Sequence, residues 1–226
     1  MVFVFRNSRC IRLVMATMVH AAPGPSRFYD GLDRQFINGV WRTGKSSRTV
    51  KDVNPYTGET LLEIAGARAE DLDEAYLTAS KAQKAWAAAL PSQRATVLRE
   101  VAGIMEARRE EIVNWLVRES GSTRIKAQLE WETTHAVMLE SAAMPYLVEG
   151  RVLPCDVPGK ECRVYRQPVG VVGVISPWNW PLHLTARSLG PALAVGNAVV
   201  VKPSSDTPVT GGLLFAKMLE EAGLPP

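Results

Sequence analysis

The sequence predicts an α/β fold that combines a parallel sheet with a separate group of helices. Two almost wholly apolar runs, residues 169–175 and 198–201, have the composition of strands buried on both faces of a parallel sheet. The segment between them has the length of a crossover helix, so the three together predict a βαβ unit. Residues 69–147 repeat apolar side chains at helical spacing instead.

The first 29 residues differ from the rest of the chain in their charge. They carry four arginines and no acidic residue, whereas the remainder is nearly neutral. Their apolar run at residues 1–5 is too short for a secretory signal. We expect residues 1–29 to be a disordered extension or a start read too early; an Arg-bearing, acid-free start also resembles a mitochondrial leader.

Residues 36–65 predict short strands joined by tight turns. Asn38 and Gly39 form a strong hairpin signal between two short apolar segments. A second turn is expected at residues 54–59, followed by the apolar run 61–65. Together these segments predict an N-terminal β meander.

Residues 69–147 predict about three helices, divided at Pro91, Gly121 and Pro145. The charged residues between the apolar positions are interpreted as a solvated face without chemistry. The apolar stripe of the first helix consists of Leu72, Ala75, Tyr76, Ala79, Ala82 and Trp86.

Residues 150–167 predict a two-stranded ribbon around the turn 156–159. Its alternating polar residues indicate a ribbon exposed on at least one face, and an exposed edge can pair with another subunit. Cys155 and Cys162 flank the turn. We expect ordinary thiols there, although a cross-strand disulfide is conceivable.

The last sixty residues predict two strands, each followed by a loop and a helix. The first strand ends at the loop 176–181, which two prolines make rigid. A helix over about 182–194 ends at Gly196 and Asn197. After the second strand and Lys202-Pro203, a further helix is expected to start with Asp206 or Thr207 as its N-cap and to run to Ala222.

Polar residues follow both strands, where ligands of open α/β sheets bind. Asn179, between two tryptophans on a proline-bounded loop, is suited to be a fixed amide donor. Lys202, followed by Ser204 and Ser205, offers donors for ribose or phosphate oxygens. A turn-forming asparagine and an exposed strand-end lysine are the alternatives for these two residues taken singly.

Composition excludes several classes of protein and site. A nearly neutral body without a concentrated basic face argues against nucleic acid as a partner. No apolar stretch reaches the roughly 18 residues of a membrane span. The three cysteines form no zinc-type pattern, and an odd number without a framework indicates a reducing compartment, so we expect a cytoplasmic location, or a mitochondrial one if the N-terminal extension is real.

The motifs at these strand ends resemble the aldehyde dehydrogenase superfamily. The resemblance is carried by PVGVVGVISPWNWP at residues 168–181, LGPALAVGN at 189–197 and VKP at 201–203. It continues more weakly through FING at 36–39, NPYTG at 54–58 and the segment 82–86. It implies an aldehyde-dehydrogenase-like fold with an incomplete Rossmann-type parallel sheet, N-terminal helices and a ribbon that serves oligomerisation.

The resemblance also implies roles for the strand-end residues. Asn179 would stabilise the negative oxygen that forms when a thiolate adds to an aldehyde. Lys202 and the serines after it would contact the adenosine ribose of NAD or NADP. The backbone of Ile175, Ser176, Pro177 and Trp178 would line the cofactor cleft; this family binds its dinucleotide without a G-x-G-x-x-G motif.

Cofactor and substrate preference rest on single positions. Many NAD-preferring relatives carry a glutamate where this chain has Ser205, so NADP becomes possible. Trp180, His183 and Arg187 lie where the substrate tunnel of the family passes. The arginine followed by serine resembles the benzaldehyde and vanillin dehydrogenase branch, which implies oxidation of an aromatic aldehyde to its acid.

The resemblance further implies which parts of such an enzyme this chain holds. Residues 30–226 would be a partial NAD(P)-binding domain, with the ribbon 150–167 bridging subunits of a homo-oligomer. The nucleophilic cysteine of the thiohemiacetal and thioester steps, the general-base glutamate and the catalytic domain would lie after Pro226, so this chain alone would be inactive. Two alternatives stay open: a nucleotide-binding or subunit-binding protein without catalysis, and a helical scaffold.

Overall fold

The computed structural model describes residues 28–226, so the segment 1–27 and the expectations placed on it lie outside the described residues. Tyr29 falls within the segment 1–29 that we expected to be a disordered extension, but it packs against the helices. Its backbone N–H donates to Glu111 at 2.7 Å, and the guanidinium of Arg108 lies 3.7 Å from its ring centroid.

Two hairpins form the N-terminal region. β1 (Gln35–Ile37) pairs with β2 (Val40–Arg42) through a turn in which both Asn38 and Gly39 have positive φ, as the Asn-Gly signal predicts. β3 (Thr49–Val53) pairs with β4 (Thr60–Ala65). The predicted meander is wrong, because the two hairpins are separate two-stranded sheets.

Four helices follow in place of the expected three: α1 (Ala69–Ala88), α2 (Pro91–Ala107), α3 (Arg109–Ser120) and α4 (Arg124–Ala143). The predicted second helix is divided at Arg108, whose φ of −107° and ψ of 20° leave the helical region. This break has no glycine or proline to mark it in the sequence. The stripe of α1 is only partly covered, since Trp86 is buried but Leu72 and Tyr76 stay exposed.

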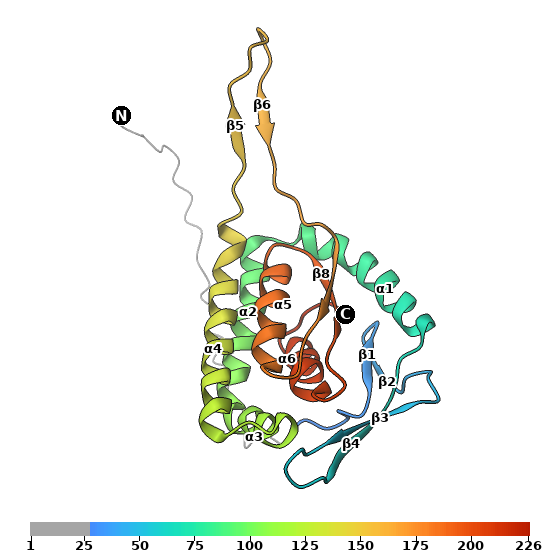
Figure 1. Cartoon of the computed structure of the whole chain (residues 1–226). Helices are drawn as coiled ribbons and strands as arrows, with labels where there is room; N and C mark the ends of the chain where they lie inside the picture. Colours follow the sequence, from blue (N-terminus) through green and yellow to red (C-terminus); the bar gives the residue numbers. More distant parts are fainter. Residues whose placement is uncertain (1–27) are drawn as a thin grey trace, which may run out of the picture.

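The ribbon confirms its prediction and projects from the body (Figure 1). After a short turn of helix, η1 (Met144–Tyr146), β5 (Arg151–Leu153) pairs antiparallel with β6 (Cys162–Val164). Cys155 and Cys162 are free, exposed thiols. The ribbon also exposes large apolar side chains, among them Val152, Val164 and Tyr165.

The βαβ unit confirms the predicted fold class. β7 (Val171–Ile175) and β8 (Ala198–Lys202) are parallel, and α5 (Pro181–Ala194) connects them. Gly196 ends the connection with a φ of +92°. The Asn197 side chain accepts from Gly170 N–H at 3.0 Å, which ties the start of β7 to the start of β8.

After β8 the chain forms a π-helical segment, η2 (Val209–Leu213), and then α6 (Leu214–Glu221). The helical segment starts at Pro208, directly after Thr207, as predicted, but neither the Asp206 nor the Thr207 side chain caps it. The first backbone N–H groups, from Val209 and Thr210, instead donate to the Glu119 carboxylate of α3 at 2.6 and 2.8 Å. Glu119, about 90 residues away in sequence, therefore caps this helix in place of a local side chain.

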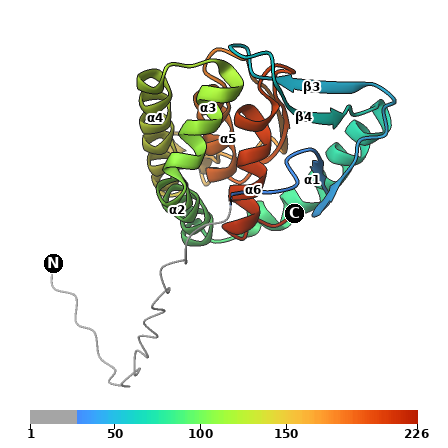
Figure 2. The ribbon, with the colours of Figure 1, turned by 90° about the horizontal axis from the view of Figure 1, so that it is seen from below.

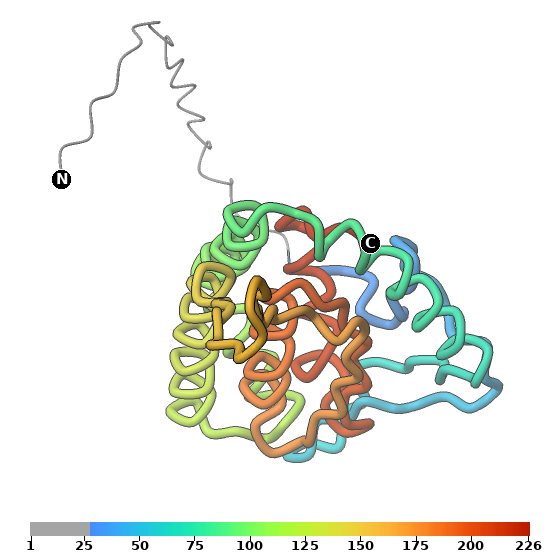
Figure 3. The backbone as a smooth tube through the Cα atoms, turned by 90° about the horizontal axis from the view of Figure 1, so that it is seen from above, coloured from blue at the N-terminus to red at the C-terminus, as the bar shows by residue number. Residues whose placement is uncertain are grey.

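The helices form a layer beside the βαβ unit. Figure 2 shows α2, α3 and α4 on one side of α5 and α6, and the hydrophobic core lies between these two groups. Seen from above in Figure 3, α1 runs along one side of the molecule toward the helical layer. It contacts both parallel strands and crosses β7 at Gly173, where a Cβ would lie 2.5 Å from the Tyr76 hydroxyl.

No helix among residues 28–226 is both long and apolar enough to cross a membrane.

Candidate functional site

The parallel register brings the two predicted polar loops to one edge of the sheet. Ile175, the last residue of β7, pairs with Lys202, the last residue of β8. The pairing continues for one bond, because Ser176 N–H donates to the Lys202 carbonyl at 3.3 Å. We call the two loops after these strands, residues 176–180 and 203–207, the strand-end rim.

The first rim loop is anchored at its base and open at its tip. Ser176 is buried and its Oγ lies 3.5 Å from the Gly211 carbonyl, which also accepts from Thr185 Oγ1 at 2.7 Å. Pro177, Trp178 and Asn179 are exposed. The Asn179 carboxamide is therefore accessible on a loop whose two ends are fixed, which is the condition for a preorganised donor.

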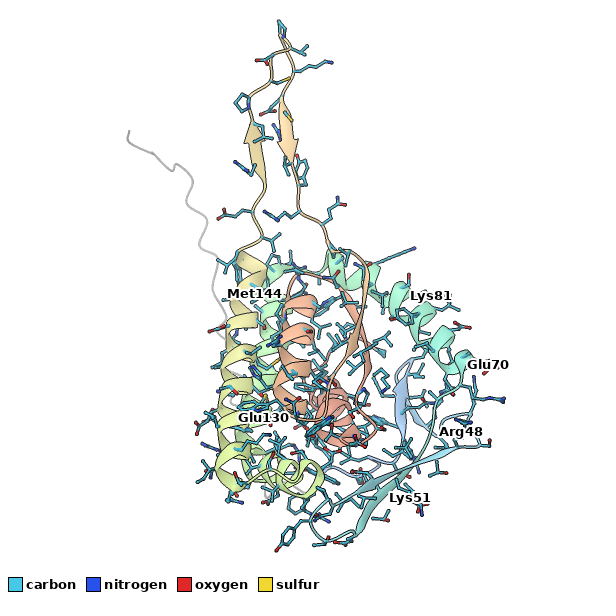
Figure 4. All side chains as sticks on the ribbon, viewed as in Figure 1. Arg48, Lys51, Glu70, Lys81, Glu130 and Met144 are labelled. Atoms are coloured by element: carbon cyan, nitrogen blue, oxygen red, sulfur yellow. The ribbon has the colours of Figure 1, made fainter. Side chains whose placement is uncertain are left out.

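The helix that follows this loop begins without a local cap. Trp180 offers no side-chain acceptor and Pro181 has no N–H, so Leu182 and His183 carry the first free backbone donors of α5. Both donate to Oε1 of Glu130 in α4, at 2.9 and 3.4 Å. Figure 4 shows Glu130 on the side of α4 that faces α5.

The three residues predicted for substrate contact lie along the start of α5. Trp180 is half-buried, and its ring meets the His183 ring edge-on with centroids 5.8 Å apart. Arg187 is exposed. Nδ1 of His183 is buried and has no hydrogen-bond partner among the described residues.

The second rim loop presents donors to solvent. Lys202 is exposed and makes no ion pair within the described part of the chain. The Ser204 hydroxyl accepts from Asp206 N–H at 3.3 Å, which shapes the turn, and Ser205 is exposed. Ammonium and hydroxyl groups thus lie beside the exposed apolar side chain of Ile175. This combination suits a ribose carrying a flat apolar base.

Two glutamates beneath the rim are buried, so the interpretation of the charged residues in 69–147 as a solvated face is wrong for them. Glu119 and Glu130 are almost fully buried, and each caps the helix that follows one rim loop. Their spacing carried a signal. Glu130 lies three residues after buried Ala127 and four before buried Thr134, so it belongs to the core-facing stripe of α4.

Glu119 has a second carboxyl beside it. Asp52 of β3 is fully buried, and neither of its oxygens receives an N–H or O–H from another group in residues 28–226. Burial raises the pKa of Asp52 to about 6, and burial together with Asp52 raises the pKa of Glu119. Both shifts favour the protonated forms, so the folded chain binds a proton at this pair more tightly than the unfolded chain does.

Some features lie away from the rim. An open depression of about 640 Å³ lies between α1 and the first residue of β7, Val171, at the opposite end of the strand from Asn179. Among the described residues no group of three or more His, Cys, Asp or Glu side chains is placed to hold a metal ion.

The comparison with known families decides the identity of this arrangement. The aldehyde dehydrogenase family model matches residues 41–226, which includes both strands, the rim and the helical layer. The chain belongs to the aldehyde dehydrogenase family. The family resemblance predicted from the rim motifs is thereby confirmed.

Two of the most similar relatives are dehydrogenases named for aromatic aldehydes. A vanillin dehydrogenase of Corynebacterium glutamicum is 51% identical over 199 residues, which are 87% of this chain and 41% of that protein. A benzaldehyde dehydrogenase of Bacillus subtilis is 43% identical over 197 residues, again 87% and 41%. This aldehyde dehydrogenase chain therefore spans about two fifths of the length of these relatives.

Solved structures agree with the sequence comparison. The crystal structure of an NAD-dependent benzaldehyde dehydrogenase from Corynebacterium glutamicum superposes with a TM-score of 0.84 at 51% identity, covering 86% of this chain and 42% of that one. A salicylaldehyde dehydrogenase from Pseudomonas putida G7, solved with salicylaldehyde, gives a TM-score of 0.80 at 32% identity over 84% of this chain and 39% of that one. The predicted aldehyde-dehydrogenase-like fold is confirmed.

Proposed function

We propose that this chain supplies the cofactor-binding and oxyanion-stabilising part of an enzyme that oxidises an aromatic aldehyde with NAD or NADP. The observation that carries this proposal is the strand-end rim: the exposed Asn179 amide and the exposed Lys202, which has no ion pair among residues 28–226, lie at the same end of two adjacent parallel strands. The relatives named for vanillin and benzaldehyde support the substrate class. The NAD-dependent benzaldehyde dehydrogenase structure supports the cofactor class.

In this proposal the first rim loop serves the reacting carbonyl. A nucleophile that adds to the aldehyde carbon leaves a negative charge on the aldehyde oxygen, and the Asn179 N–H group donates to it. The charge develops only as the bond forms, so the donor lowers the barrier rather than tightening substrate binding. Trp180, His183 and Arg187 border the approach and select an aromatic ring.

The second rim loop and the end of β7 serve the cofactor. Lys202, Ser204 and Ser205 hold the ribose, and the segment Ile175–Trp178 lines the cleft. The nicotinamide, when bound, accepts the hydride that the aldehyde carbon loses. With Ser205 in place of an acid, this loop has no negative charge to repel a 2′-phosphate, so both NAD and NADP are accepted.

Oligomerisation through the ribbon is part of the same proposal. An isolated two-stranded hairpin is marginally stable in water, and this one exposes Val152 and Tyr165 by 67% and 70%. Pairing with another copy of the enzyme would cover these side chains and extend the ribbon into a larger sheet.

A segment exchange tests the substrate class. In the Corynebacterium vanillin dehydrogenase, the segment that aligns with this chain is replaced by the aligned residues of this chain; we call the product the exchange enzyme. We expect it to oxidise benzaldehyde with a kcat/KM at least about tenfold above that for lactaldehyde, with the unaltered relative as positive control. A folded exchange enzyme that prefers lactaldehyde, or oxidises neither, contradicts the proposal.

A further inference from the structure

The loop that carries Asn179 owes its position to a side chain from another layer of the fold. Asn179 precedes the first residue of α5 by two positions, so wherever the first turn of α5 lies, Asn179 follows. That turn has neither a local side-chain cap nor an N–H on Pro181. Its first two N–H groups both meet Oε1 of Glu130, which comes from α4 and is fully buried.

The second carboxylate oxygen of Glu130, Oε2, also accepts a hydrogen bond. Lys126 Nζ, one helical turn earlier on α4, donates to Oε2 at 2.9 Å and to Ser122 Oγ at 2.8 Å. The Lys126 ammonium also lies 5.1 Å from the ring centroid of Trp180, the residue that follows Asn179. The ammonium on one side and the helix N-terminus on the other fix the position of this buried carboxyl group.

The other rim loop has the same device with a different partner. Pro208 also lacks an N–H, and Glu119 accepts from the next two residues at 2.6 and 2.8 Å. Glu119 faces a second carboxyl, Asp52, where Glu130 faces a lysine. Each rim loop is therefore held by its own glutamate, and the two can be disturbed separately.

We propose that Glu130 is the positioning residue of the Asn179 loop: its carboxylate, fixed by Lys126, holds the first turn of α5 so that the Asn179 carboxamide stays aimed at the aldehyde oxygen. The proposal rests on the oxyanion role proposed above for Asn179. A donor displaced by about 1 Å loses much of its effect on the transition state, so loosening this turn lowers kcat. It leaves the cofactor contacts of Lys202 and Ser205 intact.

Hydrogen exchange on the whole chain tests the first step. Glu130→Gln removes the charge but keeps the shape, so the Leu182 and His183 amides should exchange at least about tenfold faster than in the parent. Glu140→Gln removes an exposed acid from the same helix and should leave both amides unchanged. Unchanged exchange of Leu182 in the Glu130 variant overturns the proposal.

A double-mutant cycle in the exchange enzyme tests the second step. We expect Glu130→Gln to lower kcat about tenfold with the cofactor KM unchanged within about twofold. If Glu130 acts through Asn179, adding Glu130→Gln to Asn179→Ala lowers kcat no further. An additive fall, or a fall matched by an equal rise in cofactor KM, shows a merely structural role and overturns the proposal.

A second variant covers the case in which Glu130→Gln does not fold. Lys126 is partly exposed, so Lys126→Met removes the cation without leaving a deep cavity. Lys126→Met should lower kcat by about threefold. In an enzyme that already carries Asn179→Ala, it should leave kcat unchanged. If the exchange enzyme itself oxidises no aldehyde, the proposed function fails and takes this proposal with it, whereas an active enzyme with an additive cycle removes this proposal alone.

Discussion

At the scale of single residues, the proposed function assigns ground-state binding and transition-state stabilisation to different side chains. Lys202 ends β8 and Asn179 lies on the loop after the neighbouring strand β7, yet one is proposed to hold the cofactor and the other the reacting oxygen. Both positions could be predicted from the sequence, because they follow apolar strands on proline-bounded loops. The capping glutamates could not be read as such, since their partners are backbone N–H groups about 50 and 90 residues away.

Lys202→Ala in the exchange enzyme should raise the cofactor KM about tenfold and change kcat much less. In its proposed role the lysine would contact the ribose equally in the ground and transition states, so its loss would weaken both states alike. Steady-state kinetics with varied NAD gives both constants. Lys81→Ala, an exposed lysine on α1, is the matched control. A variant in which kcat falls and KM stays constant would assign Lys202 to the chemical step instead.

Ser205→Glu should raise the KM for NADP about tenfold or more while NAD is little affected. If Ser205 contacts the ribose as proposed, the new carboxylate would face the 2′-phosphate and repel it. Ser205→Gln has similar size without the charge and should leave the NADP KM near the parental value. Equal effects of the two substitutions on NADP would show that bulk, not charge, sets cofactor preference at this position.

Asp52→Asn should stabilise the chain most above neutral pH. The folded pair keeps a proton that the unfolded chain releases near pH 4, so stability decreases as pH rises from about 4 through the folded pKa of Asp52, about 6. The asparagine amide supplies a permanent donor to Glu119 and removes this loss. Urea unfolding at about pH 7.5 should show a gain of roughly 1 to 3 kcal/mol.

The control for this substitution is Asp73→Asn, which removes an exposed carboxylate from α1. It should leave the pH dependence of unfolding unchanged. Arg118 is the charged group that acts on Asp52 from the α3 side, and it is unaltered in both variants. A parental pH slope in Asp52→Asn would mean that folding does not raise the pKa of Asp52.

At the scale of elements, local chemistry decided what was predictable. Asn38-Gly39, Pro91, Gly121 and the 156–159 turn all set boundaries through their own backbone preferences, and the structure has breaks at each. No glycine or proline marks the break at Arg108, whose side chain lies against the Tyr29 ring and pairs with Glu111 three residues later. The predicted meander failed for a related reason, because pairing between hairpins is not encoded in turn residues.

The ribbon is the element through which we propose that the enzyme oligomerises. Val152→Glu puts a charge on its exposed apolar surface and should dissociate the exchange enzyme into smaller species, because burying an unpaired carboxylate in an interface is costly. Sedimentation velocity at micromolar concentration measures the size. Tyr56→Glu, in the turn of a different hairpin, adds the same charge at a fully exposed site and should change nothing. Identical sedimentation of both variants and the parent would remove the ribbon from the interface.

At the scale of the whole molecule, the helical layer acts as a support for the strand-end rim. α3 and α4 each send one buried glutamate beneath a rim loop, while the core between these helices and α5 fixes the distance. The βαβ unit, its strand order and the location of the rim could be predicted from the apolar runs. The capping of the rim helices by Glu119 and Glu130 could not be predicted, because these contacts form only when the two layers pack together.

The central claim is that aldehyde oxidation takes place at the Asn179 loop, and the direct measurement is the kcat of the exchange enzyme with and without Asn179→Ala. We predict that the substitution lowers kcat for benzaldehyde about a hundredfold, the usual cost of one oxyanion donor, with cofactor KM nearly unchanged. Parental turnover in Asn179→Ala, under conditions in which hydride transfer limits the rate, would contradict the account and leave Asn179 a turn-forming residue.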